Sequence, residues 1–305
     1  MGRSRRTELR TPRDKIPDVR STTLPPDSIA RRRPRILPPA LAVALCVASA
    51  CTPLVRQDFS LRVLVFNIHA GKDAAGKPNL NDVANLVRST DADLAMLQEV
   101  DRTTRRSGNV DQIQVLSDAT NFASAFGRSL DYDGGQYGIA ALSRTRFDDV
   151  QTFPLPTKPQ QPRAGGAIEP RAALVATART PLGPLTLVTT HLDASATDEY
   201  RLQEATHLLT LVQPRLTAEA LVLVGGDFNA EPGSRVLARL QEAGLRDAWT
   251  ECGSGDGFTY PAVKPTKRID YLFLTGRLTC TSARVIETNM SDHRPLLVTV
   301  VRKAP

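Results

Sequence analysis

Several apolar runs in the sequence end in a polar side chain that a hydrophobic core cannot use. The runs are rich in Val, Leu and Ile, as are strands that are buried on both faces. The polar residues at or near their ends are amides, acids and histidines: Asn67, Gln98, Glu99, His191, Asp227, Asn229, Asp270, Asp292 and His293. In α/β proteins, ligands bind beyond the carboxyl ends of strands. We therefore expect these side chains to form one site.

The residue types in this set restrict its chemistry. Carboxylate and amide oxygens are hard ligands that suit Mg²⁺, or Mn²⁺ in its place, better than Zn²⁺. The chain has only four histidines and no His-x-x-x-His or Cys-x-x-Cys spacing, which disfavours a zinc site. The sequence contains neither a Gly-rich nucleotide-binding loop nor a Gly-x-Ser-x-Gly elbow. The reaction that fits is metal-assisted attack of water on a phosphorus centre, with an acid that positions the water and a histidine that stabilises charge.

The elements that must position these residues follow from the apolar patterns. Buried strands are expected at residues 61–66, 93–97, 138–142, 172–178, 185–190, 220–224, 269–274 and 296–301. Helical spacing predicts helices at residues 81–88, 112–120, 197–216 and 234–243. The later strands follow one another without helices, which favours a mixed α/β domain with more than one sheet over a simple βαβ repeat. We expect one domain over residues 60–303.

The order of the polar motifs resembles that of the endonuclease/exonuclease/phosphatase superfamily. The matching segments are Phe66-Asn67-Ile68-His69, Leu97-Gln98-Glu99-Val100, Thr190-His191-Leu192-Asp193, Gly225-Gly226-Asp227-Phe228-Asn229, Arg268-Ile269-Asp270-Tyr271 and Ser291-Asp292-His293-Arg294-Pro295. The resemblance covers roughly residues 60–303. It implies an α/β four-layer sandwich, in which two mixed β-sheets pack face to face and α-helices flank them.

The resemblance also implies a metal site. Glu99 matches the principal metal ligand and Asn67 lies beside it in the family's pattern, while Asp292 takes a share in metal binding. Many nucleases of the superfamily have an acid or amide two residues after the first Asn. Here that position is His69, and whether it reaches the metal or is a loop histidine is left open.

Roles in the reaction are implied in the same way. Asp227 resembles the residue that orients or deprotonates the attacking water, and Asn229 resembles the amide that holds that water or the phosphate. His293 resembles the histidine that contacts the scissile phosphate, and Asp270 the acid that orients it. An alternative for Asp270 is a structural salt bridge to the nearby Arg268. His191 resembles the second histidine that contacts phosphate.

Two further residues, Tyr137 and Arg171, are candidates for lining the phosphate side of the site. The match of Arg171 to the family is loose. A structural role explains either residue equally well, and both readings stay open.

The basic charge of the chain lies in its first residues. Residues 1–35 hold 11 of the 39 Lys and Arg residues and 4 of the 32 Asp and Glu residues, so residues 36–305 hold 28 of each. The catalytic domain therefore has no overall basic excess of the kind that strong non-specific binding to nucleic acid needs. Binding to nucleic acid stays possible and is not favoured.

The N-terminal segment predicts export. Residues 1–35 read as a disordered basic tail or a misassigned start, and residues 36–51 as an apolar lipoprotein signal that ends in Ala-Ser-Ala-Cys. Cys51 would then be lipidated and residues 52–59 would form a tether. The alternatives are a twin-arginine-type signal, or a disordered tail before one short buried apolar segment. We expect a monomeric lipoprotein, anchored to a membrane of the periplasm or cell envelope.

Cys46 lies inside the apolar signal, so Cys252 and Cys280 are the two cysteines of the predicted domain. They could pair in an oxidising compartment, or stay unpaired as small apolar residues. The sequence leaves both possibilities open.

Taken together, these features predict a Mg²⁺-dependent phosphoester hydrolase, specifically a phosphodiesterase. The expected substrate is a phospholipid or a phosphorylated small molecule. A secreted nuclease that acts on DNA or RNA is the first alternative. A catalytically inactive, membrane-anchored binding protein is the second.

Overall fold

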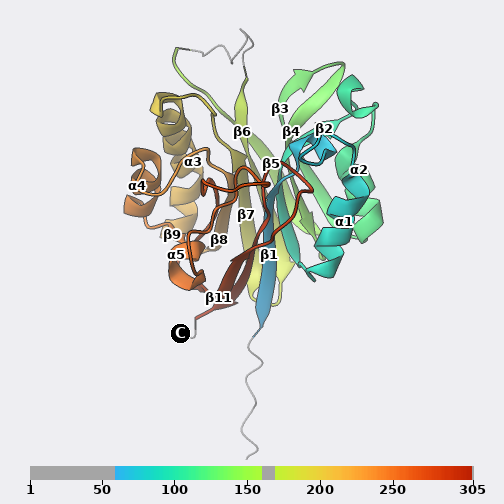
Figure 1. Cartoon of the computed structure of the whole chain (residues 1–305). Coiled ribbons are helices and arrows are strands. Elements are labelled where there is room, and N and C mark those ends of the chain that lie inside the picture. The colour runs from blue at the N-terminus through green and yellow to red at the C-terminus, as the bar shows by residue number, and fades with distance from the viewer. Residues whose placement is uncertain (1–58, 160–168, 304–305) are drawn as a thin grey trace, which may run out of the picture. The chain divides into compact units, whose positions relative to one another are not determined.

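The computed structural model describes residues 59–159 and 169–303 of the 305-residue chain (Figure 1). The basic tail, the apolar signal and Cys51 therefore lie outside the described residues, and the predictions made for them stay predictions. None of the described helices is long and apolar enough to span a membrane.

The first sheet has six strands. In spatial order they are β11 (Leu278–Val285), β12 (Leu296–Arg302), β1 (Ser60–Asn67), β2 (Leu94–Arg102), β4 (Gly135–Ser143) and β3 (Ala123–Tyr132). Only β1 and β2 run parallel, and the other neighbours are antiparallel. The connection between the two parallel strands contains α1 (Leu80–Ser89), as a crossover between parallel strands requires.

The second sheet repeats this plan with six more strands. Their order is β5 (Phe147–Leu155), β6 (Arg171–Thr180), β7 (Gly183–His191), β8 (Leu221–Asp227), β10 (Asp270–Leu274) and β9 (Arg246–Asp247). Its single parallel pair is β7 and β8, joined through the long helix α3 (Glu199–Thr217). Both sheets are therefore mixed, as predicted.

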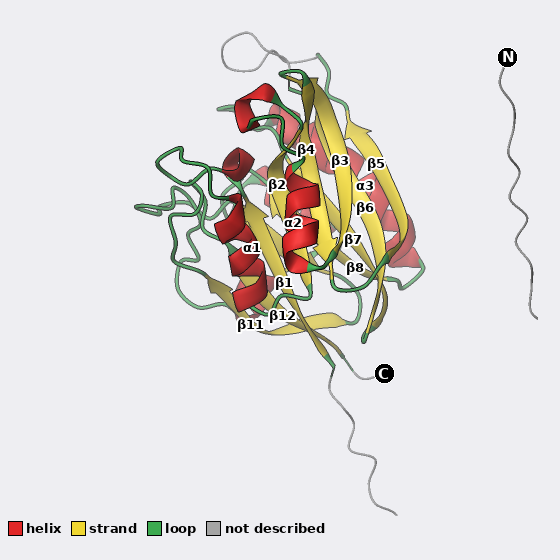
Figure 2. Ribbon diagram, turned by 90° about the vertical axis from the view of Figure 1, so that its right-hand side faces the viewer, coloured by secondary structure: helices red, strands yellow, loops and turns green. Residues whose placement is uncertain are grey.

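The helices cover the outer faces of the sheets. Figure 2 shows α1 and α2 (Gln112–Thr120) side by side on the first sheet. Helices α3 and α4 (Arg235–Glu242) cover the second sheet. The short α5 (Ala248–Cys252) packs beside β11, and two 3₁₀ turns, His69–Gly71 and Arg105–Ser107, complete the described helices.

Side-chain caps fix the starts of two helices. Ser234 accepts a hydrogen bond from the Leu237 N–H at the start of α4, and Asp111 accepts one from the Gln114 N–H at the start of α2.

Successive side chains of a strand point to opposite faces of its sheet, and this alternation produces three hydrophobic layers. In β1, Val63 and Val65 point between the sheets, whereas Leu64 and Phe66 point toward α1 and α2. The second sheet places the side chains of one face between the sheets and those of the other against α3 and α4. Each such buried side chain contributes about 1.5–3 kcal/mol of hydrophobic free energy. The predicted four-layer sandwich is confirmed.

The sequence missed the strands at the edges of the sheets. Every strand that it predicted lies inside a sheet, and β3, β5, β9 and β11, which it did not predict, are the four edges. Edge strands pair on one side only, so they tolerate the polar residues, glycine and proline that obscure the strand pattern. The helix α5 was also missed, because it is only five residues long.

Cys252 and Cys280 form a disulfide, which is one of the two possibilities that the sequence left open. The bond joins the end of α5 to β11, and its Cα atoms are 6.1 Å apart. For a separation of 28 residues, the chain-entropy model gives a contribution of about 3–4 kcal/mol to stability.

The two parallel pairs bring the polar strand ends to one edge of the sandwich. Asn67 is in register with Gln98 at the ends of β1 and β2, and His191 is in register with Asp227 at the ends of β7 and β8. The antiparallel β10 begins at this edge, where Asp270 pairs with Asp227. The topology therefore explains why residues far apart in the sequence gather here.

Gly226 allows β8 to approach β7 closely at this edge. Its φ of +148° lies where L side chains are rarely found, and a Cβ atom there would lie 1.9 Å from the Thr190 carbonyl oxygen. The next residue is Asp227, so the close approach at Gly226 also sets the position of that carboxylate beside His191.

We predict that Gly226→Ala destabilises the domain more than Gly233→Ala. Gly233 also has a positive φ, +81°, but its added Cβ would meet nothing within 4 Å. The control should lose about 1 kcal/mol from the conformation alone. Gly226→Ala should lose a further 1–3 kcal/mol or so because the strands must move apart. Urea unfolding measures both losses, and equal losses would contradict the assigned close approach.

Candidate active site

Asn67 joins the two sheets at the edge of the sandwich where the polar strand ends meet, which we call the catalytic edge. The residue is fully buried at the end of β1, and its Nδ2 donates to Glu99 Oε1 and to Asp227 Oδ2, both at 3.1 Å. Its Oδ1 accepts from the backbone N–H of His69 at 3.1 Å. Glu99 belongs to the first sheet and Asp227 to the second, so a single amide brings carboxylates from both sheets together.

A β-bulge directs Glu99 toward the site. The register between β2 and β4 shifts between Leu97 and Val100, and Glu99 has a φ of +55°. Bulges redirect side chains in this way, and a positive φ at a residue other than glycine is uncommon. Glu99 is therefore half-buried at the cavity while Gln98 stays fully buried.

Asp227 lies at the centre of the polar network. Its Oδ1 accepts from the Asn229 N–H at 2.9 Å, and its Oδ2 lies 3.4 Å from His191 Nε2 and 3.6 Å from His293 Nε2. Burial raises the pKa of Asp227 to about 7, against the lowering effect of the His293 charge. A carboxyl with such a pKa gains and loses its proton near neutral pH.

His293 is held by Asp270. Its Nδ1 lies 2.8 Å from Asp270 Oδ2, so the other ring nitrogen, Nε2, faces Asp227. Burial alone would lower the pKa of His293, but the charges of Asp270 and Asp227 outweigh it and raise the pKa to about 10. His293 is therefore positively charged at neutral pH. Asp270 bonds to His293 here, and the alternative salt bridge to Arg268 is not formed, because Arg268 pairs with Asp247 at 2.6 Å.

Asn229 connects the second histidine to the network. It has a φ of +47° in the loop after β8, and its Nδ2 lies 3.1 Å from His191 Nε2. The same amide donates to the Leu192 carbonyl at 3.0 Å. Asp227, Asn229 and His191 thus form one connected group.

A serine fixes the loop that carries Asp292 and His293. Ser291 Oγ donates to the Asn67 carbonyl at 2.7 Å and accepts from the His293 N–H at 3.2 Å. Asp292 Oδ1 lies 3.8 Å from His69 Nδ1. Whether His69 takes part in metal binding stays a prediction.

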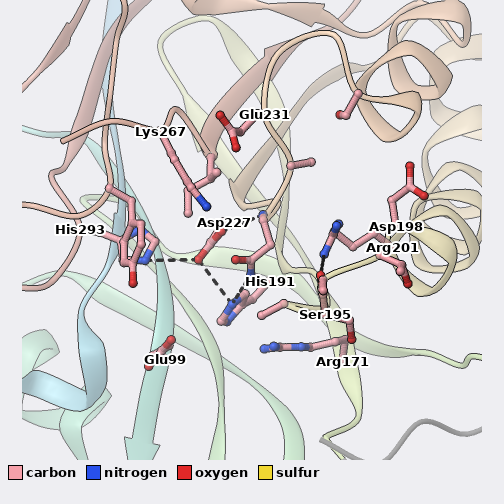
Figure 3. A pocket seen from close by; sticks show the side chains of 18 of the residues that line it. Glu99, Arg171, His191, Ser195, Asp198, Arg201, Asp227, Glu231, Lys267 and His293 are labelled. Atoms are coloured by element: carbon pink, nitrogen blue, oxygen red, sulfur yellow. Dashed lines mark hydrogen bonds and ion pairs between the residues drawn. The ribbon is translucent and has the colours of Figure 1, made fainter. Parts of the chain in front are cut away.

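These residues surround a cavity of about 840 Å³, seen from close by in Figure 3. The predicted site residues that line it are Glu99, Arg171, His191, Asp227, Asn229, Asp292 and His293. Asn67 and Asp270 lie outside the lining and are hydrogen-bonded to residues within it. The structure therefore brings all the predicted residues except Tyr137 to this site.

Tyr137 lies elsewhere in the first sheet. It is buried in β4, where the guanidinium carbon of Arg106 is 5.3 Å from its ring centroid and the Tyr132 ring is 6.4 Å away. It does not line the cavity. A role on the phosphate side is thus not supported by its position.

The sequence reasoning missed Tyr260. Its ring packs 4.8 Å from that of His293 and lines the cavity. Burial raises the pKa of Tyr260, and the negative charges of Asp292, Asp227 and Glu99 add to that effect. Lys267 and Arg201, which also line the cavity, were missed as well. Tyr260 is the only one of the three with a recognisable signal, since it is an aromatic residue in a Gly- and Pro-rich loop.

The donor set fits a divalent cation. Among the described residues, Asp227, Asp270 and Asp292 form ion pairs only with histidines. Glu99 accepts a hydrogen bond from the neutral amide of Asn67, and none of the four acids is paired with a described Lys or Arg. The buried Asp270 Oδ1 has no hydrogen-bond partner. Asn67 and Glu99, with Asp292, would hold a metal on the predicted assignment. Asp227, Asp270 and His293, whose ligand atoms lie within 4.8 Å of one another, form a second possible group beside it.

Comparisons with known proteins agree with this architecture. A family model described as "Endonuclease/Exonuclease/phosphatase family" matches residues 64–293. The uncharacterized protein YbhP of Escherichia coli K12 is 26% identical over 254 residues, which are 79% of this chain and 96% of YbhP.

Two solved structures are similar in fold. An endonuclease/exonuclease/phosphatase from Beutenbergia cavernae DSM 12333 has a TM-score of 0.65 at 21% identity, and the match covers 80% of this chain and 72% of that one. The mannosyl-6-phosphatase Bt3783 of Bacteroides thetaiotaomicron VPI-5482 has a TM-score of 0.64 at 18% identity, with 79% and 99% covered. At these identities the likeness establishes the fold.

The charges around His293 give a prediction for the metal-free protein. Asp270→Asn removes the nearest negative charge, so the pKa of His293 should fall by at least about one unit. Asp292→Asn is the matched control and should lower it less, because its charge acts more weakly on His293. Titration of the imidazole by NMR measures both shifts. Equal shifts in the two variants would show that Asp270 has no special hold on His293.

Proposed function

The chain belongs to the endonuclease/exonuclease/phosphatase family, and from that premise we propose that it is a Mg²⁺-dependent phosphoester hydrolase, specifically a phosphodiesterase. The observation that carries this proposal is the placing of Asp227 between two histidines, His191 and His293, within 3.6 Å of both. An acid in contact with two histidines, beside further carboxylates that carry no described Lys or Arg partner, suits metal-assisted hydrolysis at a phosphorus centre.

In the proposed reaction, a bound Mg²⁺ would neutralise phosphate oxygens. Asp227 Oδ2 orients the attacking water and takes its proton, which suits a carboxyl whose pKa is about 7. Asn229 holds the water or the phosphate. Its position is fixed by the bond from its own N–H to Asp227 Oδ1.

The charged His293 stabilises negative charge on the phosphate in the transition state. Asp270 fixes the ring through Nδ1 and leaves the Nε2 proton for a phosphate oxygen. His191 makes a second contact, and Arg171 provides a buried cation on the cavity wall. Asn67, Glu99 and Asp292 would hold the metal.

We propose a phospholipid head group or a phosphorylated small molecule as the substrate. The cavity is of a size that holds a small ligand. The mannosyl-6-phosphatase among the similar structures acts on a phosphorylated sugar by its name, which supports small substrates for this fold. The balanced charge of residues 36–305 makes a nuclease the weaker alternative.

An inactive binding protein is the remaining alternative. Loss of catalysis usually leaves gaps in a catalytic set, and here Asn67, Glu99, Asp227, Asp270 and His293 form a continuous network. That continuity supports an enzyme.

The test is hydrolysis of phosphodiester and phosphomonoester reporters, a phospholipid panel and plasmid DNA, with and without Mg²⁺. We expect phosphodiester cleavage that chelation abolishes and that serine-directed inhibitors do not affect. Full activity after exhaustive chelation would contradict the metal mechanism. Cleavage of plasmid DNA alone would favour the nuclease alternative.

Variants separate the metal site from the phosphate contact. His293→Ala should lower kcat by about 10²–10⁴-fold, and added Mg²⁺ should not restore it. Glu99→Gln loses a charged ligand, so raised Mg²⁺ should partly restore its kcat. Asp270→Asn should act in the same direction as His293→Ala with no larger effect, and the double variant should be far from additive. Recovery of His293→Ala, but not of Glu99→Gln, by Mg²⁺ would reverse the assigned roles.

We also propose that the protein is an exported monomer, anchored through lipidated Cys51. The Ala-Ser-Ala-Cys sequence at the end of the apolar run supports this. The Cys252–Cys280 disulfide suits an oxidising compartment. Cys51→Ala should release the protein from the membrane fraction or block its maturation, whereas Cys46→Ala should do neither. An intact N-terminus on soluble cytoplasmic protein would exclude a lipid anchor.

A further inference from the structure

Arg201 is a buried cation on the cavity wall that the proposed reaction does not use. It lies in the first turn of α3 and is only 8% exposed. Its Nη1 donates to the carbonyl oxygens of Asp193 at 3.0 Å and Ser195 at 2.6 Å. Its Nε is buried without a hydrogen-bond partner. The protein thus satisfies only part of the donor capacity of this guanidinium, and the residue lines the cavity.

The charge of Arg201 is not balanced by a neighbouring acid. Among the described residues it forms no ion pair with a carboxylate within 4.0 Å. Glu204, one turn further along α3, accepts from the Asp193 N–H at 2.7 Å. Burial raises the pKa of Glu204 to about 8, despite the lowering charges of Arg171 and Arg201. Glu204 is therefore mostly neutral at pH 7.

A second buried arginine lies nearby on the same wall. Arg171 is 3% exposed and lies 3.2 Å from Glu169, and its Nε also has no hydrogen-bond partner. Figure 3 shows the side chains of Arg171 and Arg201 reaching toward the cavity from the wall beyond His191. Two buried guanidinium groups thus lie on one wall of the cavity.

This region is continuous with the catalytic centre. The same cavity contains His293 and Asp227 at one side and Arg201, Ser195 and Thr197 at the other. The loop between them is held rigidly, because Arg201 binds two of its carbonyls and Glu204 binds one of its N–H groups. The wall is therefore preformed for a ligand.

We propose that Arg201, with Arg171 on the same wall of the cavity, forms a second anion subsite. The substrate would carry, beyond the scissile phosphate, another anionic group such as a carboxylate or a phosphate. The proposal rests on the proposed function, because it places that phosphate between His293 and Asp227.

The acids at this end of the cavity do not oppose the assignment. Asp198 is paired with Arg235 at 3.1 Å, so its charge is already balanced. Glu199 and Glu231 are exposed, where solvent screens them. Arg171 is paired with Glu169, whereas Arg201 is buried without such a partner among the described residues, so the charge of Arg201 acts most strongly on a ligand inside the cavity.

The test compares ligands that differ only in charge. We choose phosphonoacetate, 3-phosphonopropionate and 4-phosphonobutyrate, each beside its carboxamide, and measure binding by calorimetry to the protein in Mg²⁺-containing buffer. At least one acid should bind about tenfold or more tightly than its amide, because a charge-assisted hydrogen bond replaces a neutral one. The preference should weaken at high salt. No preference at any chain length overturns the subsite.

Variants identify the residue responsible. Arg201→Gln should bind acid and amide equally while its affinity for the amide stays near that of the parent protein. Arg201→Lys should keep part of the preference, and it remains informative if Arg201→Gln does not fold. Lys267→Gln is the control, since Lys267 is an exposed cation on the same cavity. A preference that survives Arg201→Gln but disappears in Lys267→Gln overturns the assignment.

The binding measurement is independent of turnover. A protein that prefers the acid but hydrolyses no phosphoester would keep the subsite and contradict the proposed function. A protein that hydrolyses phosphodiesters without preferring the acid would keep the function and contradict the subsite.

Discussion

The close approach of two buried carboxylates is the constraint to which the rest of the site responds. Asp227 and Asp270 occupy paired positions on β8 and β10, and each is about 1% exposed. Like charges so close in a medium of low dielectric repel strongly. His293 bonds to Asp270 and faces Asp227, and Asn67 donates to Asp227 from the other sheet. Positive charge and amide donors thus collect around the pair, and a metal would add to the same compensation.

The backbone is shaped to satisfy this constraint. A bulge turns Glu99 into the site, a positive φ at Asn229 does the same in the second sheet, and Gly226 removes the side chain that would hold β8 away from β7. The positive φ angles at Glu99 and Asn229 each cost about 1–3 kcal/mol, and such departures persist only where packing fixes them. The three hydrophobic layers supply that packing.

The strands that are buried on both faces could be predicted from the sequence, whereas the strands at the edges of the sheets could not. The interior strands are apolar throughout, so they could be recognised without a structure. The edge strand β5 carries Asp148, Asp149 and Pro154, and its exposed face hides the pattern. In the site, the ordered motifs pointed to Asn67, Glu99, Asp227, Asp270 and His293, which the structure brings into one network. Tyr137 does not line the cavity, since adjacency in a motif does not fix which face of a strand meets it. The sequence could not identify Arg201 as a site residue. Its interest comes from its burial without a carboxylate partner among the described residues, and only the three-dimensional structure shows this.

The disulfide has a mechanical consequence. Cys280 lies near the Val300 end of β12, and the catalytic edge is at the opposite end, where Leu296 pairs with Val65. The two sheets are thus covalently tied at the end remote from catalysis, through α5 and β11, and at the catalytic end they are joined by the amide of Asn67. Between these two links the sheets are joined by the apolar layer that packs between them. Because the covalent tie is remote from the site, it leaves the spacing between Glu99 and Asp227 to the amide of Asn67, whose two hydrogen bonds alone span from one carboxylate to the other.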